Sequence, residues 1–467
     1  MRFNPVHLWA ILGSTLLIRL LSLGAYPLMD TTEARYGEMA RLMIETQNWV
    51  TPQFDYGVPF WGKPPLFTWM SAGGIEAFGV NEFAVRFPHW LAGIVVMLLM
   101  ANFARSQKLS GLVTALVLAT CGIFAIAAGA VMTDMALTLG MTLAMVGFFR
   151  CWQGSRGWGY VGFIGLAIGL LAKGPLVLVL MGLAVVPWVL VRHGVFQGVA
   201  LFVKRVPWLG GSLLMLAIAL PWYLLAEQRT PGFLDYFIIG EHIKRFLVSG
   251  WQGDLYGTAH DEVRGTIWLF WLYSAAPWSL VLPVLLWRKR KALRGLLQED
   301  QGVLSFALWW LISPMVLFSL SGNILPAYVL PGIPALGIAI AKLTEDIKPD
   351  AKWFKVTASV VPVLLVIAVF ILHLGVAEKR SDKRILAHAD RQIATFYIGK
   401  RPFSGQFYSS GQAKVLTDVN EIDRRNAVQL IGHPNEVEPI IADLHLSCIV
   451  EMTAKSQRTL YKCSEPT

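Results

Sequence analysis

The chain has 467 residues, of which 55% are hydrophobic and only 15% are charged, and its mean hydropathy is +0.54. This composition excludes an ordinary soluble enzyme and is typical of a polytopic membrane protein. The net charge of +10 would suggest a nucleic-acid partner in a soluble protein. Here the basic residues fall in short loops between apolar segments, as the positive-inside rule expects, so we expect no nucleic-acid partner.

Apolar stretches long enough to cross a bilayer recur along the chain. We place about eleven spans near residues 8–25, 83–104, 110–130, 135–152, 158–172, 174–191, 206–226, 265–287, 302–320, 325–341 and 356–375. The first lacks a small-residue cleavage site and is followed by further spans, which indicates a retained transmembrane helix with a cytoplasmic N-terminus.

The basic connections fix the expected orientation. The most basic of them, WRKRKALRG at 287–295, marks the cytoplasmic side. The loops 26–82 and 227–264, the neighbourhoods of Asp134 and Lys173, and the polar tail then all lie on the opposite, extracytoplasmic side. Every chemically suggestive segment therefore shares one face of the membrane.

The first loop is unusually rich in charge for a chain this apolar. Apolar residues recur at helical spacing over 33–44, which predicts a short amphipathic helix lying along the membrane interface. Thr31 or Thr32 can cap that helix, and Asp30 and Glu33 near its N-terminus either stabilise it or take part in catalysis. The local pattern alone leaves both interpretations open.

The GKPP turn at 62–65 holds Lys63 in a fixed place, because its two prolines stiffen the backbone. An ammonium group beside clustered carboxylates suits an anionic phosphate substrate together with a hydroxyl that is to be deprotonated. Alternatively, Lys63 extends to the lipid headgroups.

Two further charges interrupt apolar sequence. Asp134 lies at the mouth of two apolar segments, and an acid at membrane depth is costly enough to be treated as functional unless it only caps a helix. Lys173 precedes Gly174 and Pro175, which break the helix there, so its ammonium could contact a phosphate or extend to the headgroups.

The segment GEHIKRF places Glu241, His242 and Arg245 within about one helical turn. His242 is a weak candidate metal ligand or a phosphate contact, although a histidine beside a glutamate is more often a hydrogen-bonded structural residue.

The composition changes sharply near residue 376. The polar region 376–467, with short alternating apolar runs, predicts a small α/β domain. If this tail is periplasmic, Cys448 and Cys463 should form a disulfide, because that compartment is oxidising and the loop between them is short. The other two cysteines, Cys121 and Cys151, lie in apolar spans, and none of the four has the spacing of a metal site.

Three motifs of the first loop occur in order: EARYGEMAR, NWVTPQFDYGVPFWGKPPLFTW and NEFAVRFP. Together they resemble the first extracytoplasmic loop of membrane glycosyltransferases with the GT-C fold. The closest likeness is to the aminoarabinose lipid A transferase and protein O-mannosyltransferase-like group, which uses a polyprenyl-phosphate-linked sugar as donor. The resemblance implies a mostly α, polytopic transmembrane bundle (1–375, with the loops 26–82 and 227–264) and a small C-terminal extracytoplasmic α/β domain (376–467).

The resemblance also implies roles for particular residues. Asp30 or Glu33 would act as the base, Asp30 being the first choice, and Asp134 would assist. Tyr328 lies in a Tyr-Leu-Pro pattern similar to the family's lipid-carrier groove. The residues expected to bind the donor phosphate or the substrate are Arg35, Tyr36, Lys63, Lys173, Glu241, His242, Arg245 and Tyr328.

The chain departs from the family pattern at three places. The usual Asp-Glu pair is Thr32-Glu33 here, with Asp30 two positions upstream. Gly62 stands where an acid often precedes the lysine, which weakens the case for a bound divalent metal, and no other cofactor is expected. Gly322 and Asn323 replace a lysine that would contact the carrier phosphate.

Together with the expected topology, this resemblance implies an inverting-type glycosyltransferase of the bacterial inner membrane with a periplasmic active site. It would move a sugar from polyprenyl (undecaprenyl) phosphate to an extracytoplasmic acceptor, with lipid A or lipopolysaccharide as the first choice. Its partners would be the lipid-linked sugar, a lipid or glycan acceptor, and membrane lipids. The alternatives are transfer to protein, as in O-mannosyltransferases, a transporter or flippase for the lipid carrier, and a noncatalytic assembly protein.

Overall fold

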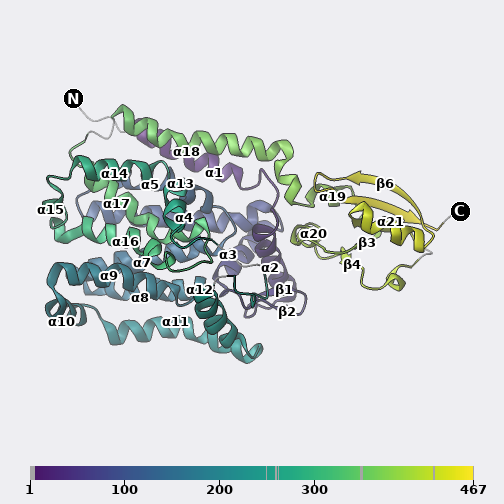
Figure 1. The fold of residues 1–467 in the computed structure, drawn as a ribbon, viewed down its shortest axis with the longest axis horizontal. Coiled ribbons are helices and arrows are strands. Elements are labelled where there is room, and N and C mark those ends of the chain that lie inside the picture. Colours follow the sequence, from purple (N-terminus) through teal and green to yellow (C-terminus); the bar gives the residue numbers. More distant parts are fainter. Residues whose placement is uncertain are drawn as a thin grey trace.

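A computed structural model of the chain describes residues 6–248, 250–257, 260, 262–347, 351–423 and 426–465. It has two parts, a long helical bundle and a small α/β domain at one end of it (Figure 1). The first loop, drawn in purple, lies between them. The chain is a multi-pass membrane protein, and this arrangement is the predicted one.

The bundle and its loops contain the following elements: α1 (Val6–Ser22), α2 (Thr32–Thr46), β1 (Gln53–Asp55), β2 (Val58–Pro59), α3 (Leu66–Phe78), α4 (Glu82–Ser106), α5 (Gly111–Ala119), α6 (Gly122–Ala127), α7 (Thr133–Trp152), α8 (Arg156–Lys173), α9 (Leu176–His193), α10 (Val195–Arg205), α11 (Trp208–Arg229), the π-helix η1 (Asp235–Lys244), α12 (Arg245–Leu247), α13 (Ile267–Ser274), α14 (Trp278–Arg288), α15 (Leu293–Leu296), η2 (Asp300–Gly302), α16 (Val303–Phe318), η3 (Pro326–Gly332), α17 (Ile333–Leu343) and α18 (Lys352–Ile371).

Each of the eleven predicted spans contains helix, but the count itself is not confirmed. Among the described residues, seven helices are long and apolar enough to cross a membrane, or up to eight if α13 and α14 form one span bent by 96°. The predicted span 110–130 is divided into α5 and α6, and α1 has only 17 residues. Average hydropathy does not detect such breaks.

Helices α7 and α8 pack against each other through glycines. A Cβ atom on Gly140 would lie 2.6 Å from the backbone nitrogen of Gly169, and one on Gly147 would lie 2.5 Å from that of Gly162. Only glycine permits this separation between helix backbones. The contact brings the first turn of α7, with Asp134, beside the last residue of α8, Lys173.

Helix α2 confirms the helix predicted over 33–44, but its surroundings differ from those expected. Glu38 and Arg41, although charged, are both buried and form an ion pair with a 2.6 Å separation. The prediction of a helix lying along the interface is therefore wrong in this respect, because the apolar residues of α2 also pack inside the protein, in one cluster with Phe407 of the C-terminal domain. Thr31 is the N-cap, without a hydrogen bond from its side chain.

The C-terminal domain is built on a five-stranded sheet with the strand order β4-β3-β5-β7-β6. Strand β3 is parallel to β4 and β5, and the other pairs are antiparallel. Its elements are η4 (Leu372–Val376), η5 (Ala377–Arg380), α19 (Lys383–His388), β3 (Ala394–Tyr397), α20 (Phe403–Tyr408), β4 (Lys414–Val415), η6 (Val419–Glu421), β5 (Val428–Gly432), α21 (Pro434–Asp443), β6 (Ser447–Thr453) and β7 (Thr459–Ser464).

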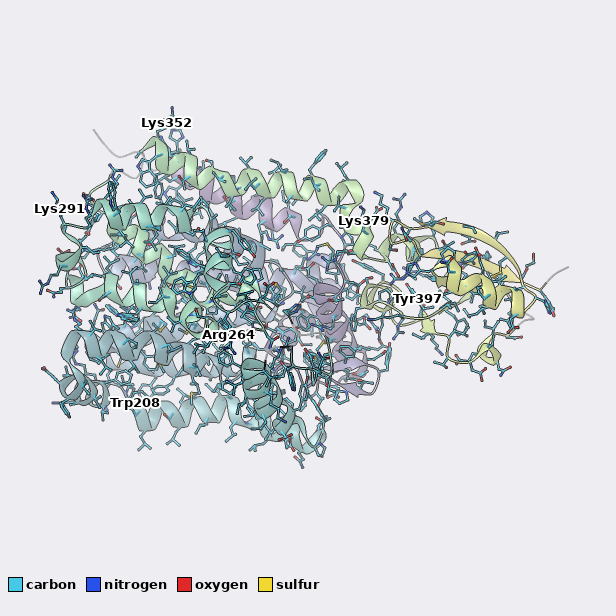
Figure 2. All side chains as sticks on the ribbon, in the orientation of Figure 1. Trp208, Arg264, Lys291, Lys352, Lys379 and Tyr397 are labelled. Carbon is cyan, nitrogen blue, oxygen red and sulfur yellow. A yellow bond between two sulfur atoms is a disulfide. The ribbon has the colours of Figure 1, made fainter. Side chains whose placement is uncertain are left out.

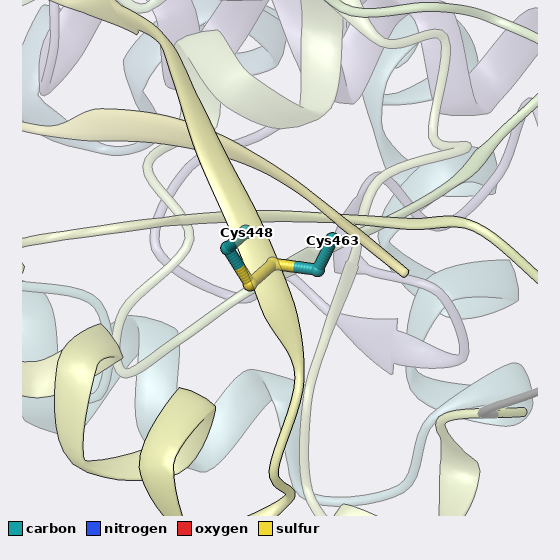
Figure 3. Close-up of a disulfide and its surroundings, with 2 residues drawn as sticks. All are labelled: Cys448 and Cys463. Atoms are coloured by element: carbon teal, nitrogen blue, oxygen red, sulfur yellow. A yellow bond between two sulfur atoms is a disulfide. The ribbon is translucent and has the colours of Figure 1, made fainter. Parts of the chain in front are cut away.

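A disulfide joins the two strands at the edge of this sheet. Cys448 of β6 lies opposite Cys463 of β7 in the antiparallel register, and their sulfur atoms are bonded (Figure 3). This is the pairing predicted for an oxidising compartment. The free cysteines, Cys121 and Cys151, are both buried.

The C-terminal domain is attached to the first loop by polar contacts from α20 and its neighbours. Ser404 donates hydrogen bonds from its backbone nitrogen and its hydroxyl to the carboxylate of Asp30. Arg401 pairs with Asp55 at 3.0 Å, and Tyr408 donates to Glu82 at 2.7 Å. These contacts fix the domain over the loop that carries the family motifs.

Candidate active site

The first group of predicted site residues forms a buried cluster of charges. The carboxylate of Glu241 accepts hydrogen bonds from Lys63 at 2.7 Å and from Arg245 at 3.0 Å. The Glu241 side chain is only 4% exposed, and those of its two partners are 18% exposed. Burial would raise the pKa of Glu241, but Lys63 and Arg245 outweigh it and lower that pKa to about 2. We call these three residues the cationic cluster, because two cations share one carboxylate.

Local sequence explains how the members of the cationic cluster are held. Lys63 precedes Pro64 and Pro65, and Pro65 is the N-cap of α3. Glu241 lies in η1 and Arg245 begins α12, four residues later. A π-helical segment is rare and occurs frequently at functional sites. The cluster therefore joins the first loop to the loop 227–264, as the prediction of one shared site requires.

The second group contains Asp134, Lys173 and Tyr328. The Nζ atom of Lys173 donates to Oδ1 of Asp134 at 2.7 Å and lies 4.3 Å from the ring centroid of Tyr328. Both charged side chains are buried. Breaking a buried pair by removing one partner leaves an uncompensated charge, so the two residues depend on each other. The sequence singled out all three but did not predict this pair.

His242 connects the two groups. Its Nε2 atom lies 3.2 Å from the carbonyl oxygen of Lys173, and its Nδ1 atom lies 2.7 Å from that of Phe237. Gly174 makes the close approach possible, because a Cβ there would lie 2.6 Å from the Phe237 ring and 3.0 Å from His242 Nε2. Burial lowers the pKa of His242.

These surroundings do not fit a metal ion. Both ring nitrogens of His242 face backbone carbonyl oxygens, and the carboxylate of Glu241 is occupied by two cations. Within the described part of the chain, no group of three or more His, Cys, Asp or Glu side chains could hold a metal. Gly62 supplies no side chain where the family often has an acid. The proposed reaction therefore uses only side chains of the protein.

Arg35 and Tyr36 lie near the start of α2, and Arg35 contacts the loop 227–264 at Tyr256. The guanidinium of Arg35 lies 4.9 Å from the ring centroid of Tyr36 and donates to the carbonyl oxygen of Tyr256 at 2.7 Å. Its Nε atom is buried and has no hydrogen-bond partner among the described residues. Tyr36 packs edge-on against Phe67, with 4.6 Å between ring centroids. A buried cationic donor that is left unpaired suits an anionic ligand.

The two carboxylates predicted to act as base are held elsewhere. Asp30 was expected to be free of the helix, but Ser404 occupies both of its oxygens. Burial raises the pKa of Asp30 although these hydrogen bonds lower it. Glu33 pairs with the buried guanidinium of Arg86 at 2.8 Å and accepts from the backbone nitrogen of Val131 at 3.3 Å. The structure thus brings together Lys63, Glu241, His242 and Arg245 with Asp134 and Lys173. Asp30 and Glu33 instead pair with Ser404 and Arg86, which are not members of this group.

Three further residues belong to the site and were not predicted. Tyr236 donates to Glu241 at 3.2 Å, and Asp254 pairs with Arg245 at 3.1 Å. The amide of Asn323 donates to the carbonyl oxygens of Arg245 at 2.6 Å and of Val248 at 3.0 Å. Asn323 had been noted only as the neutral replacement of a lysine, and it fixes the segment that carries Arg245.

Comparison with known proteins agrees with the motifs of the first loop. Residues 10–237 match the family described as dolichyl-phosphate-mannose-protein mannosyltransferase. A relative from Pseudomonas fluorescens (strain Pf0-1), an undecaprenyl phosphate-alpha-4-amino-4-deoxy-L-arabinose arabinosyl transferase, is 31% identical over 70% of this chain and 56% of its own length. A relative of the same name from Edwardsiella ictaluri (strain 93-146) is 33% identical over 67% of this chain and 55% of its own length. The chain thus spans little more than half the length of these relatives.

Solved structures show the fold. The crystal structure of ArnT from Cupriavidus metallidurans bound to undecaprenyl phosphate matches with a TM-score of 0.76 and 19% identity, over 98% of each chain. Its apo state matches with a TM-score of 0.75 and 20% identity, over 97% of each chain. The predicted fold, a GT-C bundle with a C-terminal sheet domain, is confirmed, and so is the resemblance predicted from the motifs.

Proposed function

We propose that this chain, which shares the fold of a transferase and resembles aminoarabinosyl transferases over most of its length, is a membrane glycosyltransferase. It moves one sugar from a polyprenyl phosphate donor to an extracytoplasmic acceptor. The proposal rests on one observation. His242, next to Glu241 of the cationic cluster, contacts the backbone of Lys173, and Lys173 pairs with Asp134, so the two groups of charges form one site. A neighbour of the same fold was crystallised with undecaprenyl phosphate, which supports this class of donor.

The cations of the site would act on the leaving group. When the bond between the sugar's anomeric carbon and the phosphate oxygen breaks, negative charge builds up on the phosphate. Fixed positive groups that face this charge stabilise the transition state. Lys63 and Arg245 are held in place by Glu241, and the buried Nε atom of Arg35 is free to donate a hydrogen bond. Tyr36 contacts Arg35 and Tyr328 contacts Lys173, so both rings would lie beside the bound donor phosphate.

In this proposal Asp134 takes the role of base that was first expected for Asp30 or Glu33. Its carboxylate accepts a hydrogen bond from the Nζ atom of Lys173. That Nζ atom is itself a candidate contact for the donor phosphate. A phosphate that attracts Lys173 would leave Asp134 able to accept the proton of an attacking hydroxyl. The acceptor oxygen then bonds to the anomeric carbon as the polyprenyl phosphate departs on the opposite face. If the acceptor group is an ionised phosphate, no proton is removed, and Asp134 would orient that acceptor through Lys173.

We also propose that the site and the C-terminal domain are periplasmic and that the domain boundary lies near residue 376. Lys291 and Lys352, in basic connections, lie at the end of the bundle away from the sheet domain, whereas Lys379 and Tyr397 lie at or in that domain (Figure 2). The excess of basic residues at the far end supports a cytoplasmic location for it. These charges therefore support the orientation predicted from the sequence, in the bacterial inner membrane.

Lipid A or lipopolysaccharide is the acceptor that we propose first, because the curated relatives are aminoarabinosyl transferases that use undecaprenyl phosphate donors. Protein is the second, because residues 10–237 match a family of protein mannosyltransferases. A transporter for the lipid carrier is less well supported, since Lys63, Glu241 and Arg245 contact one another and the neighbouring His242 contacts Lys173, so that these residues form one cluster rather than a series along a path.

The deciding experiment supplies purified protein with undecaprenyl-phospho-aminoarabinose and either lipid A or a serine-rich peptide. We expect undecaprenyl phosphate to be released only when an acceptor is present, and sugar to appear on lipid A. Lys63→Met should abolish release, whereas Lys204→Met, which removes a lysine outside the site, should not. Transfer to the peptide alone would select the second acceptor. The absence of release with every acceptor, while the donor moves across vesicles, would favour the transporter.

A further inference from the structure

A cavity of about 640 Å³ lies at the end of the bundle away from the C-terminal domain. It is bounded by the end of α9, the segment that contains α15, and the first turns of α16, all at the left of Figure 1. The residues that matter for its chemistry are Trp188, Arg192, His193, Arg294, Trp309 and Ile312. None of them belongs to the candidate active site.

The polar side of this cavity is positively charged. Arg192, His193 and Arg294 line it, and no acidic side chain is among its lining residues, all of which are described. The nearest acids along the chain, Glu299 and Asp300, pair with Lys342 at 3.2 and 2.7 Å. The positive charge of the cavity is therefore not neutralised by its own segment, and an anion would meet no repelling carboxylate.

One ring nitrogen in the cavity, which can donate a hydrogen bond, lacks a partner. The Nε2 atom of His193 is buried and has no hydrogen-bond partner among the described residues, and its ring lies 5.3 Å from that of Trp152. Arg192 donates to the carbonyl oxygen of Gln298 at 3.2 Å. A buried donor without a partner costs free energy, which an oxygen of a bound ligand would offset.

The opposite side of the cavity is apolar. Trp188 is buried, while Leu308 and Ile312, one turn apart on α16, and Trp309 beside them are partly buried. Residues four apart share a helix face, so this wall continues along α16 toward the middle of the membrane. A hydrocarbon chain could lie on it.

The position of α10 indicates at which level of the membrane the cavity lies. This helix follows α9 after Gly194, and several of its apolar residues are exposed, with Phe196 92% and Val203 61% exposed. A helix with apolar residues on one side and Lys204 and Arg205 at its end is typical of the membrane interface. Arg192 and His193, which directly precede it, therefore lie at the level of the lipid headgroups.

We propose that this cavity binds an anionic phospholipid of the leaflet at that end of the bundle. The phosphate would accept hydrogen bonds from Arg192, His193 and Arg294, and one acyl chain would lie against Trp309 and Ile312. Basic pockets between transmembrane helices are known to bind lipid headgroups in this way. The site is separate from the proposed transfer reaction and does not depend on it.

The test uses the purified full chain in detergent and native mass spectrometry with added phosphatidylglycerol or phosphatidylcholine. We expect bound phosphatidylglycerol in preference to phosphatidylcholine. The double variant Arg192→Gln/Arg294→Gln should lower the apparent affinity for phosphatidylglycerol by about tenfold or more, because each cation near a lipid surface contributes to binding. The matched variant Arg288→Gln/Lys291→Gln removes the same charge at the same end of the bundle, outside the cavity, and should bind as the wild type does.

A second variant separates loss of the site from loss of the fold. Ser305→Trp would fill the cavity without changing its charge, and it should also exclude the lipid. Equal loss in both charge variants, or equal binding of the two phospholipids, would overturn the proposal, and so would undiminished binding by Ser305→Trp. Tighter binding of undecaprenyl phosphate than of phosphatidylglycerol, lost in Arg192→Gln/Arg294→Gln, would also overturn it and assign the cavity to the lipid carrier.

Discussion

Lys63 and Glu241, 178 residues apart in the sequence, form an ion pair with 2.7 Å between Nζ and Oε2. The pair connects the turn after the first loop's short strands to the π-helix η1. Arg245 binds the same carboxylate, so Glu241 holds two cations that would otherwise repel each other. The arrangement of the site before any substrate binds therefore depends on one carboxylate.

Glu241→Gln should destabilise the protein in a pH-dependent manner. The pKa of Glu241 is lowered from 4.5 to about 2 in the folded protein, so its ion pairs stabilise the fold above about pH 4.5, and this stabilisation is lost as the pH falls toward 2. The shift corresponds to a stabilisation of the order of 3 kcal/mol. Melting temperatures of wild type and variant should differ most at neutral pH and converge as the solution is acidified below pH 4.5. Glu76→Gln, at an exposed carboxylate of α3, should show no such convergence.

Asp134→Asn should lower transfer by roughly 100- to 10,000-fold, the usual contribution of general-base assistance to a hydroxyl acceptor. It should also lower stability by about 3 kcal/mol or more, because Lys173 would stay buried without its partner. The double variant Asp134→Asn/Lys173→Met should recover the melting temperature but not the single-turnover transfer rate. Recovery of both would mean that the pair is only structural.

Asp30→Asn and Ser404→Ala should have the same phenotype, because both break the contact between the first loop and α20. A hydrogen bond to a charged group contributes about 1.5–3 kcal/mol. Both variants should therefore expose the segment around residues 377–383 to trypsin more rapidly, while Ser409→Ala at the opposite end of α20 should not. A hundredfold loss of transfer in Asp30→Asn alone, with Ser404→Ala active, would return the role of base to Asp30.

The disulfide should be detectable by differential alkylation. Cys448 and Cys463 should resist alkylation in denatured protein until a reductant is added, whereas Cys121 and Cys151 should react on denaturation alone. Replacement of both bonded cysteines by alanine should lower the free energy of unfolding of the C-terminal domain by about 2–4 kcal/mol. Alkylation of all four residues without reductant would contradict the pairing.

The orientation can be tested with single cysteines and a membrane-impermeant thiol reagent on intact cells. Cysteines near Asp55, Gly250 and Lys414 should be labelled from the periplasm. Those near Lys108, Lys291 and Lys352 should be labelled only after the inner membrane is opened. Opposite labelling of Asp55 and Gly250 would separate Lys63 from Glu241 and contradict the site.

Local patterns were enough to predict features that depend on neighbouring residues. Apolar residues at helical spacing predicted α2, and alternating short runs predicted the sheet of the C-terminal domain. Local patterns could not show that a new helix begins at Gly122 within a predicted span, or that α13 and α14 meet at 96°. Such breaks are set by how neighbouring helices pack, which a hydropathy average does not report.

In the candidate active site, local sequence patterns predicted the residues better than the contacts between them. Sequence motifs identified Lys63, Lys173, Glu241 and Arg245, and the spacing of Glu241 and Arg245 fits their pairing. The partners of Lys63 and Lys173, however, lie 178 and 39 residues away, and Arg245 has a second partner, Asp254, in a loop that no motif marks. Asp30 was assigned by its position before a helix. Its partner, Ser404, lies 374 residues further along the chain, and nothing in the local sequence of either residue indicates the contact.

The attachment of the C-terminal domain has a consequence for biosynthesis. Ribosomes make Asp30, Asp55 and Glu82 early, but their partners Ser404, Arg401 and Tyr408 are made only after the helices of the bundle. Until then, the first loop has unpaired carboxylates and an uncovered face of α2, against which Phe407 later packs. A chain arrested before residue 400 would keep that face open to membrane-associated chaperones and proteases. The last part of the protein to be translated thus completes the first part, which allows quality control to recognise unfinished copies.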